Sequence, residues 1–317
     1  MQQPIVTISS HDAPVTSTCW VTPFSASLEG ERIIASASLD HTIHLNRLSS
    51  LSDSVWSTLA TLHLHTAPVS SVSTSSDGRH LVSAGWDGVI GIWTSAIPNQ
   101  DEVWDVEETT EKKKRRRVAE GSAEAVKKGP TGVLRSHTAR VSKAIFESSE
   151  NVSRAYSCGW DSTVRSWDVE SGTCVNTVTL PDRAHLDLAL SRGGSSSVLY
   201  AASADRTVSL VDLRTNGAQS AVKTFTHPST PSCLVTHSSS AHHLLTGAYD
   251  GALRVWDVRS PRAALARFEH VVNDKDDTPR KGKVLGVDWA HDLAACAGEV
   301  GFGLWRAGIG GNEQEQV

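Results

Sequence analysis

The residue types of a hydrolytic triad recur along this chain of 317 residues, which contains 14 histidines. Two stretches hold a histidine, a serine and an aspartate in the same order: His65, Ser83 and Asp87, and then His137, Ser157 and Asp161. A serine that donates to a histidine held by an aspartate is the arrangement that activates a nucleophile. The same residue types can also satisfy one another inside a protein without any catalysis. The position of these residues in the wider sequence decides between a catalytic and a structural role.

Outside these stretches, the sequence offers little catalytic chemistry. It contains no G-x-S-x-G elbow, no phosphate-binding P-loop and no H-E-x-x-H zinc motif. The five cysteines are scattered without C-x-x-C spacing, as expected for reduced thiols of the cytosol or nucleus. They are Cys19, Cys158, Cys174, Cys233 and Cys296. We therefore expect no catalysis, no cofactor, no metal site and no small-molecule substrate.

Composition places the chain among ordinary globular proteins. Apolar residues make up 39%, charged residues make up 21%, and the net charge is −5, which excludes wholesale disorder. Because a basic excess is absent, nucleic-acid binding driven by bulk charge is not expected. No apolar run is long enough to span a membrane, and the first residues lack the pattern of a signal peptide.

The aspartates mark an internal repeat. Equivalent acidic residues lie 44 to 49 residues apart, except for one interval of 74 residues that contains an insertion. They are Asp40, Asp87, Asp161, Asp205, Asp250 and Glu299. The six aligned segments that contain them are 35–48, 82–94, 156–169, 201–213, 245–258 and 295–307. A fixed period of this length indicates one supersecondary unit per repeat.

Each repeat has the sequence of a β-hairpin with further strands beside it. A short run of small and apolar residues enters a polar turn, and an alternating strand such as TVRSW follows. Upstream lie strand-like stretches such as VSSVSTS at 69–75, and a His-x-x-x-Val pattern begins at His11, His65 and His137. Four short strands per repeat predict an all-β propeller with six recognisable blades.

The pattern resembles the WD40 repeat, whose blades end in Trp-Asp, as in Trp167–Asp168 and Trp256–Asp257. In that family, a histidine, a serine or threonine, the turn aspartate and the tryptophan form one buried hydrogen-bonded set. Two blades match all four roles, with His65, Ser83, Asp87 and Trp93 in one and His137, Ser157, Asp161 and Trp167 in the other. The resemblance therefore implies a structural role for the histidine, serine and aspartate sets.

The buried set is expected to be incomplete in the other repeats. One repeat keeps Thr246, Asp250 and Trp256, but its histidine is not identified. Asn46 and Val211 stand at the tryptophan position of two repeats, and Glu299 stands at the aspartate position of the last. We expect these blades to rely on other contacts.

Several runs resemble one particular WD40 group. ASASLDHTI, SAGWDGVIGIW, SCGWDSTVRSWD, HPSTPSCLVTH and LTGAYDGALRVWD are similar to the WD-repeat subunit of the Pescadillo–Bop–WD-repeat complex, which acts in large ribosomal subunit assembly. That family implies a ubiquitin-like domain followed by seven blades, so the resemblance implies that this chain lacks the domain and the first blade. Alternatively, a strand at residues 4–8 completes the last blade of a six-bladed ring.

The sequence divides into four regions. We expect two blades in residues 1–94, a charged disordered insertion in 95–131, four blades in 132–309 and a polar tail in 310–317. The insertion carries six consecutive cations: Lys112, Lys113, Lys114, Arg115, Arg116 and Arg117. This run fits a nuclear localisation signal or an RNA contact. The alternative is a solvated charge run that the preceding acidic residues partly neutralise.

The residue before each turn aspartate should lie at a solvent-facing hairpin tip, on the rim that this type of family uses for partners. These residues are Leu39, Trp86, Trp160, Ala204 and Tyr249. Tryptophan and tyrosine are enriched in interface hot spots, so Trp86, Trp160 and Tyr249 are the leading partner-binding candidates, with Leu39 beside them. The alternative is that their rings pack against neighbouring blades.

These features predict a non-catalytic interaction scaffold in ribosome biogenesis, acting in pre-rRNA maturation and 60S subunit assembly. The resemblance implies a Bop-family WD-repeat protein, Pescadillo and the pre-60S particle as partners, and a location in the nucleus, nucleolus and nucleoplasm. The alternative is a WD40 substrate adaptor or chromatin-associated scaffold in another nuclear pathway, because one fold serves many functions.

Overall fold

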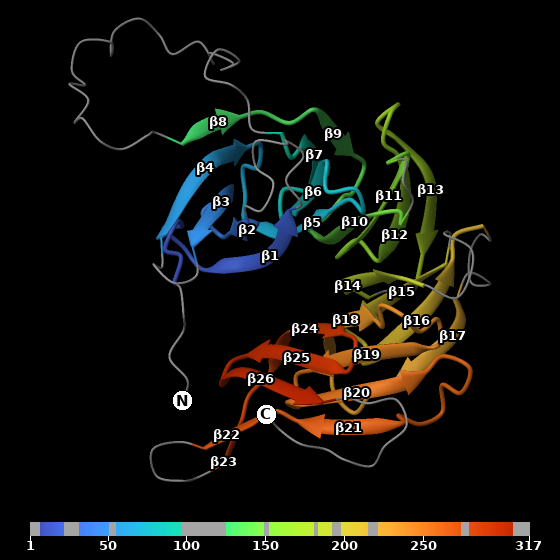
Figure 1. Cartoon of the computed structure of the whole chain (residues 1–317). Coiled ribbons are helices and arrows are strands. Elements are labelled where there is room, and N and C mark those ends of the chain that lie inside the picture. Colours follow the sequence, from blue (N-terminus) through green and yellow to red (C-terminus); the bar gives the residue numbers. More distant parts are fainter. Residues whose placement is uncertain are drawn as a thin grey trace, which may run out of the picture. The chain divides into compact units, whose positions relative to one another are not determined.

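The computed structural model describes residues 7–21, 32–50, 55–96, 125–148, 152–180, 183–191, 198–214, 221–273 and 279–306 (Figure 1). Within these ranges all regular elements are β-strands, so the predicted all-β class is confirmed. The chain divides into two compact units, Met1–Arg135 and Ser136–Val317.

The N-terminal unit contains two sheets. The first has the strand order β1 (Val15–Val21), β2 (Arg32–Ser38), β3 (Thr42–Ser50), β4 (Val55–His63) and β8 (Val126–Lys128). The second has the order β5 (Val69–Thr74), β6 (His80–Gly85), β7 (Val89–Thr94) and β9 (Gly132–Arg135). Buried residues of both sheets, including Ile33, Leu62 and Trp93, form one apolar core between them.

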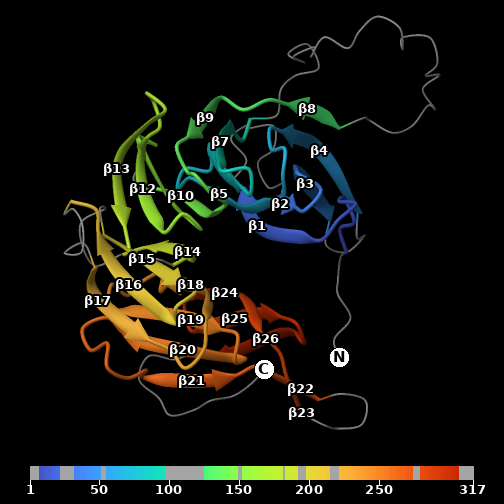
Figure 2. The ribbon, with the colours of Figure 1, turned by 180° about the vertical axis from the view of Figure 1, so that it is seen from behind.

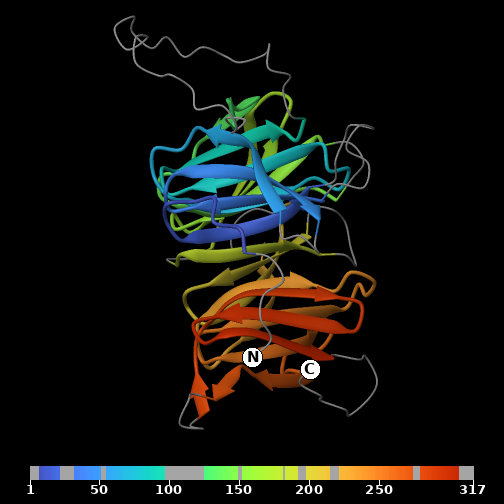
Figure 3. The same ribbon diagram turned by 60° about the vertical axis from the view of Figure 1, so that its left-hand side comes forward.

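The C-terminal unit contains four more sheets of the same kind, and Figure 3 shows the orange strands of its third sheet beside the red strands of its fourth. The first two are β10 (Val141–Phe146), β11 (Arg154–Gly159), β12 (Thr163–Asp168) and β13 (Thr173–Thr179), then β14 (His185–Leu190), β15 (Val198–Ser203), β16 (Thr207–Asp212) and β17 (Ala221–Thr226). The third is β18 (Pro231–Thr236), β19 (His243–Ala248), β20 (Ala252–Asp257) and β21 (Ala266–Glu269). The fourth has three strands, β24 (Val284–Ala290), β25 (Leu293–Gly298) and β26 (Gly301–Arg306), and follows a hairpin of β22 (Val271–Asn273) and β23 (Pro279–Lys281).

Burial explains why the strands differ in sequence. The middle strands β11, β12, β19 and β20 are buried on both faces, so they consist mostly of small and apolar residues. The outer strand β13 alternates between exposed and covered residues, as expected for a strand with one face in water. Figure 2 shows β13, β17 and β21 as the outer strands of their sheets.

Apolar layers join neighbouring sheets of the C-terminal unit. Tyr156 and Leu188 belong to the layer between its first and second sheets, and Tyr200 and Trp256 to the layer between its second and third. A further layer joins its third and fourth sheets. Among the described residues, six sheets of three or more strands, two in one unit and four in the other, confirm the six predicted WD40 blades.

The structure corrects the predicted position of the insertion between two blades. The third strand β7 of the second blade ends at Thr94, and its outer strand β9 begins only at Gly132. The insertion therefore interrupts the second blade instead of separating two blades, and residues 132–135 do not belong to the third. Blade assignment depends on strand pairing across the insertion, which the repeat pattern alone does not contain.

The end of the insertion is ordered, against the prediction of disorder through residue 131. Residues 126–128 form β8, which pairs in parallel with Ala60–Leu62 of β4. The Lys128 ammonium donates to Thr94 Oγ1 at 2.7 Å and to the Ala96 carbonyl at 2.6 Å, so it ties the two ends of the insertion together. The cations at 112–117 and the tail at 310–317 lie outside the described residues. Of the predicted strand at 4–8, residues 7 and 8 are not in a strand and the others lie outside.

Candidate functional site

The candidate site is built on the turns that join the second and third strands of each sheet. In five turns, the aspartate accepts a hydrogen bond from the backbone N–H two residues later, for example Val89 to Asp87 at 3.0 Å. The residue between them has a left-handed backbone, with a φ of 73° at Gly251 and of 70° at Arg206. This geometry turns the chain sharply and places the preceding residue at the tip.

The second and third blades contain the complete predicted set. In the third, Trp167 Nε1 donates to Ser157 Oγ at 2.8 Å, which lies 2.7 Å from His137 Nε2. His137 Nδ1 lies 2.8 Å from Asp161. In the second, His65, Ser83, Asp87 and Trp93 repeat these contacts at 2.9–3.2 Å.

These sets connect the same residue types as a catalytic triad does, but their serines are not accessible to a substrate. Ser157 is fully buried, and its hydroxyl oxygen accepts a hydrogen bond from the Trp167 indole. Burial alone raises the pKa of Asp161, but hydrogen bonds from His137 and Thr163 outweigh burial and hold that pKa well below its usual range. The carboxylate therefore stays ionised and satisfied, which is the behaviour of a structural group.

The first blade keeps the set with a different residue, against the expectation that it had decayed. Asn46 Nδ2 donates to Ser36 Oγ at 3.2 Å, where a tryptophan indole donates in the complete sets. Ser36 Oγ lies 2.8 Å from His11 Nε2, and His11 Nδ1 lies 2.8 Å from Asp40. The Asn46 carbonyl oxygen in turn accepts from Thr58 Oγ1 at 2.9 Å, so the amide is satisfied on both sides.

In the fifth blade, the unassigned histidine is His227. His227 Nε2 lies 2.9 Å from Thr246 Oγ1, to which Trp256 Nε1 donates at 2.9 Å. Burial lowers the pKa of His227 to about 4, so it is neutral at pH 7. Asp250 pairs with Arg254 instead, at 2.5 Å.

The fourth and sixth blades replace the histidine–aspartate contact by ion pairs. Arg183 pairs with Asp205 in the fourth, and Lys283 pairs with Glu299 at 3.0 Å in the sixth. In the two blades where Val211 replaces the tryptophan and Glu299 replaces the aspartate, the turn acid therefore pairs with a cation instead of a histidine. The sequence led us to expect other contacts in these blades. Reasoning from the sequence missed Arg183, although it stands close to where the other repeats place a histidine.

The predicted tip residues differ in exposure. Trp86, Trp160 and Tyr249 are 40%, 49% and 41% exposed, whereas Leu39 is half-buried. Two of the rings have a cation above them. The Arg140 guanidinium carbon lies 5.0 Å from the centroid of Trp160, and Lys283 Nζ lies 5.6 Å from that of Tyr249. These two cations were not predicted from the sequence.

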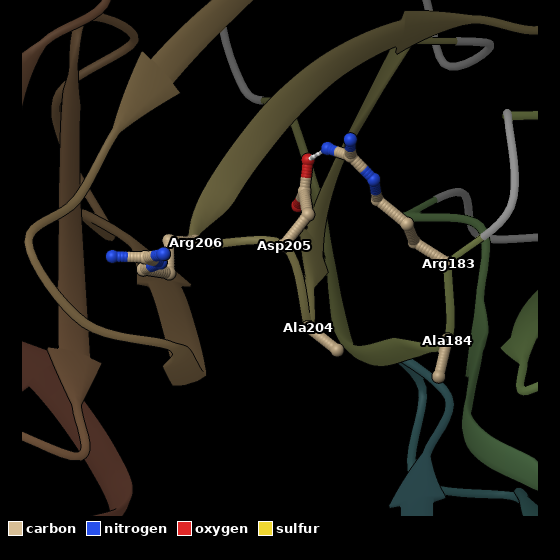
Figure 4. Close-up of a pocket in the computed structure, with 5 residues that line it drawn as sticks. All are labelled: Arg183, Ala184, Ala204, Asp205 and Arg206. Atoms are coloured by element: carbon tan, nitrogen blue, oxygen red, sulfur yellow. Dashed lines mark hydrogen bonds and ion pairs between the residues drawn. The ribbon is translucent and has the colours of Figure 1, made fainter.

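A shallow depression lies at the tip of the fourth blade, within the C-terminal unit (Figure 4). Arg183, Ala184, Ala204, Asp205 and Arg206 line it. The guanidinium of Arg183 contacts the Asp205 carboxylate, and Arg206 extends on the other side of that carboxylate. The Arg206 side chain points away from the two alanines.

The described residues bring together no group of three or more histidine, cysteine, aspartate or glutamate side chains with the arrangement of a metal site. Nor does any helix within the described ranges have the length and apolar character needed to cross a membrane.

A model of the WD domain, G-beta repeat family matches residues 56–94, 128–168 and 219–257. Each matched range includes the outer strand of one sheet and the first three strands of the next. The sequence repeat is therefore offset by one strand from the structural blade.

Curated relatives align with most of the length of this chain. Ribosome biogenesis protein YTM1 of Laccaria bicolor is 44% identical over 95% of this chain and 66% of its own length. YTM1 of Coprinopsis cinerea is 39% identical over 94% of this chain and 66% of its own. YTM1 of Saccharomyces cerevisiae is 31% identical over 74% and 52%. The chain thus spans about two thirds, or less, of the length of these relatives.

Solved structures support the fold. A structure of U3-55K matches with a TM-score of 0.70, covering 98% of this chain and 82% of that one at 21% identity. A crystal structure of RRP9 WD40 repeats matches with a TM-score of 0.69 at 20% identity. At this level of identity, the likeness concerns the fold alone.

Proposed function

Because this chain belongs to the WD40 β-propeller family and its homologues are ribosome biogenesis proteins, we propose that it is a non-catalytic interaction scaffold in ribosome biogenesis. It acts in the maturation of pre-rRNA and the assembly of the large ribosomal subunit. The observation that carries this proposal is 44% identity to a YTM1 protein over 95% of the chain.

The site chemistry supports a scaffold. The serines of the triad-like sets are buried, so a substrate carbonyl has no path to them. By contrast, the tips present Trp86, Trp160 and Tyr249 to solvent, and aromatic residues of this kind are typical anchors of protein interfaces. We assign these three residues to partner binding, with Leu39 at the edge of the surface.

The partner in this proposal is a Bop-family WD-repeat protein and, through it, Pescadillo and the pre-60S particle. The protein acts in the nucleus, with the nucleolus as the site of assembly and the nucleoplasm as the next compartment. The six cations at 112–117 supply the nuclear signal, and contact with RNA is their second use.

The test is a binding titration of this chain against the isolated propeller of the Bop-family protein, with circular dichroism as a control for folding. We expect tight binding by the unaltered chain. We expect Trp160→Ala to weaken binding by about 2 kcal/mol, the scale of an interface hot spot, with stability unchanged. The matched control is Trp20→Ala, because Trp20 is also exposed but lies on β1, away from a turn.

A folded chain that does not bind the Bop-family propeller would overturn the proposal. Equal losses of binding from Trp160→Ala and Trp20→Ala would overturn the assignment of the tips. A loss of stability in Trp160→Ala would mean that the ring packs within the molecule.

A further inference from the structure

The turn end of the C-terminal unit carries basic and aromatic side chains on consecutive blades. We call this surface the basic–aromatic rim, and it consists of Arg140, Trp160, Arg183, Arg206, Tyr249 and Lys283. Trp160 stands at the tip of the third blade, Arg206 just past the tip of the fourth, and Tyr249 at the tip of the fifth. Neighbouring blades pack face to face, so these tips succeed one another along one edge of the unit.

The carboxylates of these tips are already neutralised. Asp161 is almost fully buried and contacts His137 and Arg165. Asp205 pairs with Arg183, and the corresponding acids of the fifth and sixth blades pair with Arg254 and Lys283. Arg206 is exposed and has no ion pair among the described residues, so it adds positive charge beyond these pairs.

The aromatic side chains of the rim are exposed, and each has a cation beside it. Arg140 lies over Trp160 and Lys283 over Tyr249, which places a positive charge directly beside a large exposed apolar surface. Between the two rings lies the tip of the fourth blade, where Arg183 is paired with Asp205 and the Arg206 side chain points away from Ala184 and Ala204 (Figure 4). The Arg206 guanidinium therefore carries the charge that remains at this tip for an anionic group.

We propose that the basic–aromatic rim binds an extended acidic segment of a partner protein, with a carboxylate of that segment on Arg206 and apolar side chains on Trp160 and Tyr249. This inference deepens the proposed scaffold function, on which it rests. An extended segment advances about 3.3 Å per residue, so a short stretch reaches from one blade tip to the next.

The charge pattern favours an acidic protein over single-stranded RNA. RNA-binding surfaces of this kind follow the phosphates with a continuous positive groove. Here, Asp205 and Glu299 interrupt the positive charge at the tips of the fourth and sixth blades. Separate carboxylates on a peptide can avoid these acids, whereas a phosphate at every nucleotide cannot.

The test uses three labelled probes and fluorescence anisotropy. They are a peptide of about twelve residues in which glutamates alternate with glycine and leucine, its glutamine counterpart, and an oligouridine of about equal length. We expect the acidic peptide to bind at least about tenfold more tightly than the other two, with an affinity that falls as salt rises.

Variants locate the site. Arg206→Glu is expected to weaken the acidic peptide about tenfold or more, because it reverses the charge beside the depression. Arg262→Glu is the matched control, since Arg262 is equally an exposed arginine but lies in the loop after β20, at the other end of the blade. It should leave the affinity within about twofold.

Equal effects of Arg206→Glu and Arg262→Glu would overturn the inference. Tighter binding of oligouridine, lost in Arg206→Glu, would assign the rim to RNA instead and also overturn it. The Bop-family titration is run beside these measurements. If the chain binds the Bop-family propeller but not the acidic peptide, this inference is rejected and the proposed function stands. If the chain binds the acidic peptide but not the propeller, the proposed function is rejected and the rim remains a site for acidic segments.

Discussion

The serine hydroxyl at the centre of each complete set joins two neighbours, the tryptophan indole and the histidine ring. In the third blade, Ser157 Oγ receives the Trp167 indole hydrogen, which leaves its own hydrogen for His137 Nε2. His137 then has a hydrogen on Nδ1 to donate to Asp161. One arrangement of protons therefore satisfies the whole chain of contacts, and removing any member leaves a buried polar group without a partner.

Asp161→Ala is expected to lower the free energy of unfolding by about 1–3 kcal/mol, because the His137 ring, two backbone N–H groups and one hydroxyl lose their acceptor. Urea unfolding measures this loss. The control is Asp168→Ala in the same blade, because Asp168 accepts its hydrogen bonds from the exposed turn that follows it, so the change should cost no more than about 0.5 kcal/mol. Similar costs at both positions would contradict a buried role for Asp161.

At this scale, residue types predicted the complete sets but not their variants. His65 and His137 were identified because the same four residue types recur at the same spacing. The donor role of Asn46 was not predicted, because its amide replaces an indole only through a local geometry that includes Thr58. The role of Arg183 was not predicted either, because an arginine stands where the pattern has a histidine and satisfies the aspartate by its charge.

The hairpin turn is the element that presents the rim, and its backbone conformation is repeated more strictly than its sequence. The residue after the aspartate has a φ of 76° at Gly88 and 73° at Gly251, and Ser162 and Arg206 adopt the same region at 61° and 70°. A side chain in this region is strained by about 1–2 kcal/mol. The turn therefore holds its shape even where the residue does not favour it.

Gly251→Ala should lower the free energy of unfolding by about 1–2 kcal/mol. Its backbone is left-handed, and an added Cβ would lie 2.9 Å from the Gly282 carbonyl oxygen. Gly286→Ala is the control from β24, where an added Cβ meets no atom within 4 Å. That change should be neutral or stabilise by about 0.5 kcal/mol, because alanine orders at lower entropic cost in a strand. Thermal or urea unfolding of both variants decides, and an equal loss in the two would reject the turn argument.

Hairpins were predictable from the sequence, but the strands that flank the insertion were not. The alternating strands and Asp-Gly turns are local signals. β8 is a strand only because Val126–Lys128 pairs with Ala60–Leu62, more than 60 residues earlier. Its sequence, VKK, contains no alternation, so only the paired edge of β4 defines it.

At the scale of the whole molecule, the last sheet presents an apolar face to solvent. Register places Phe302 opposite Ala297 and Leu304 opposite Ala295, so these side chains share one face of β25 and β26. Phe302 is 68% exposed, whereas Trp305, on the other face, is buried beside Phe268. The second and third sheets of the C-terminal unit have a neighbouring sheet on each face, whereas this last sheet packs one face against the third sheet. Exposed apolar faces of this kind promote association.

Phe302→Ala is expected to change the free energy of unfolding by no more than about 0.5 kcal/mol and to reduce self-association at high concentration. Sedimentation velocity measures the association, and urea unfolding measures the stability. Phe268→Ala is the matched control, because the same truncation at a 6% exposed position in the core should cost about 3–5 kcal/mol. If Phe302→Ala instead costs more than about 2 kcal/mol, another sheet covers this face in solution, because only a packed side chain loses that much on truncation.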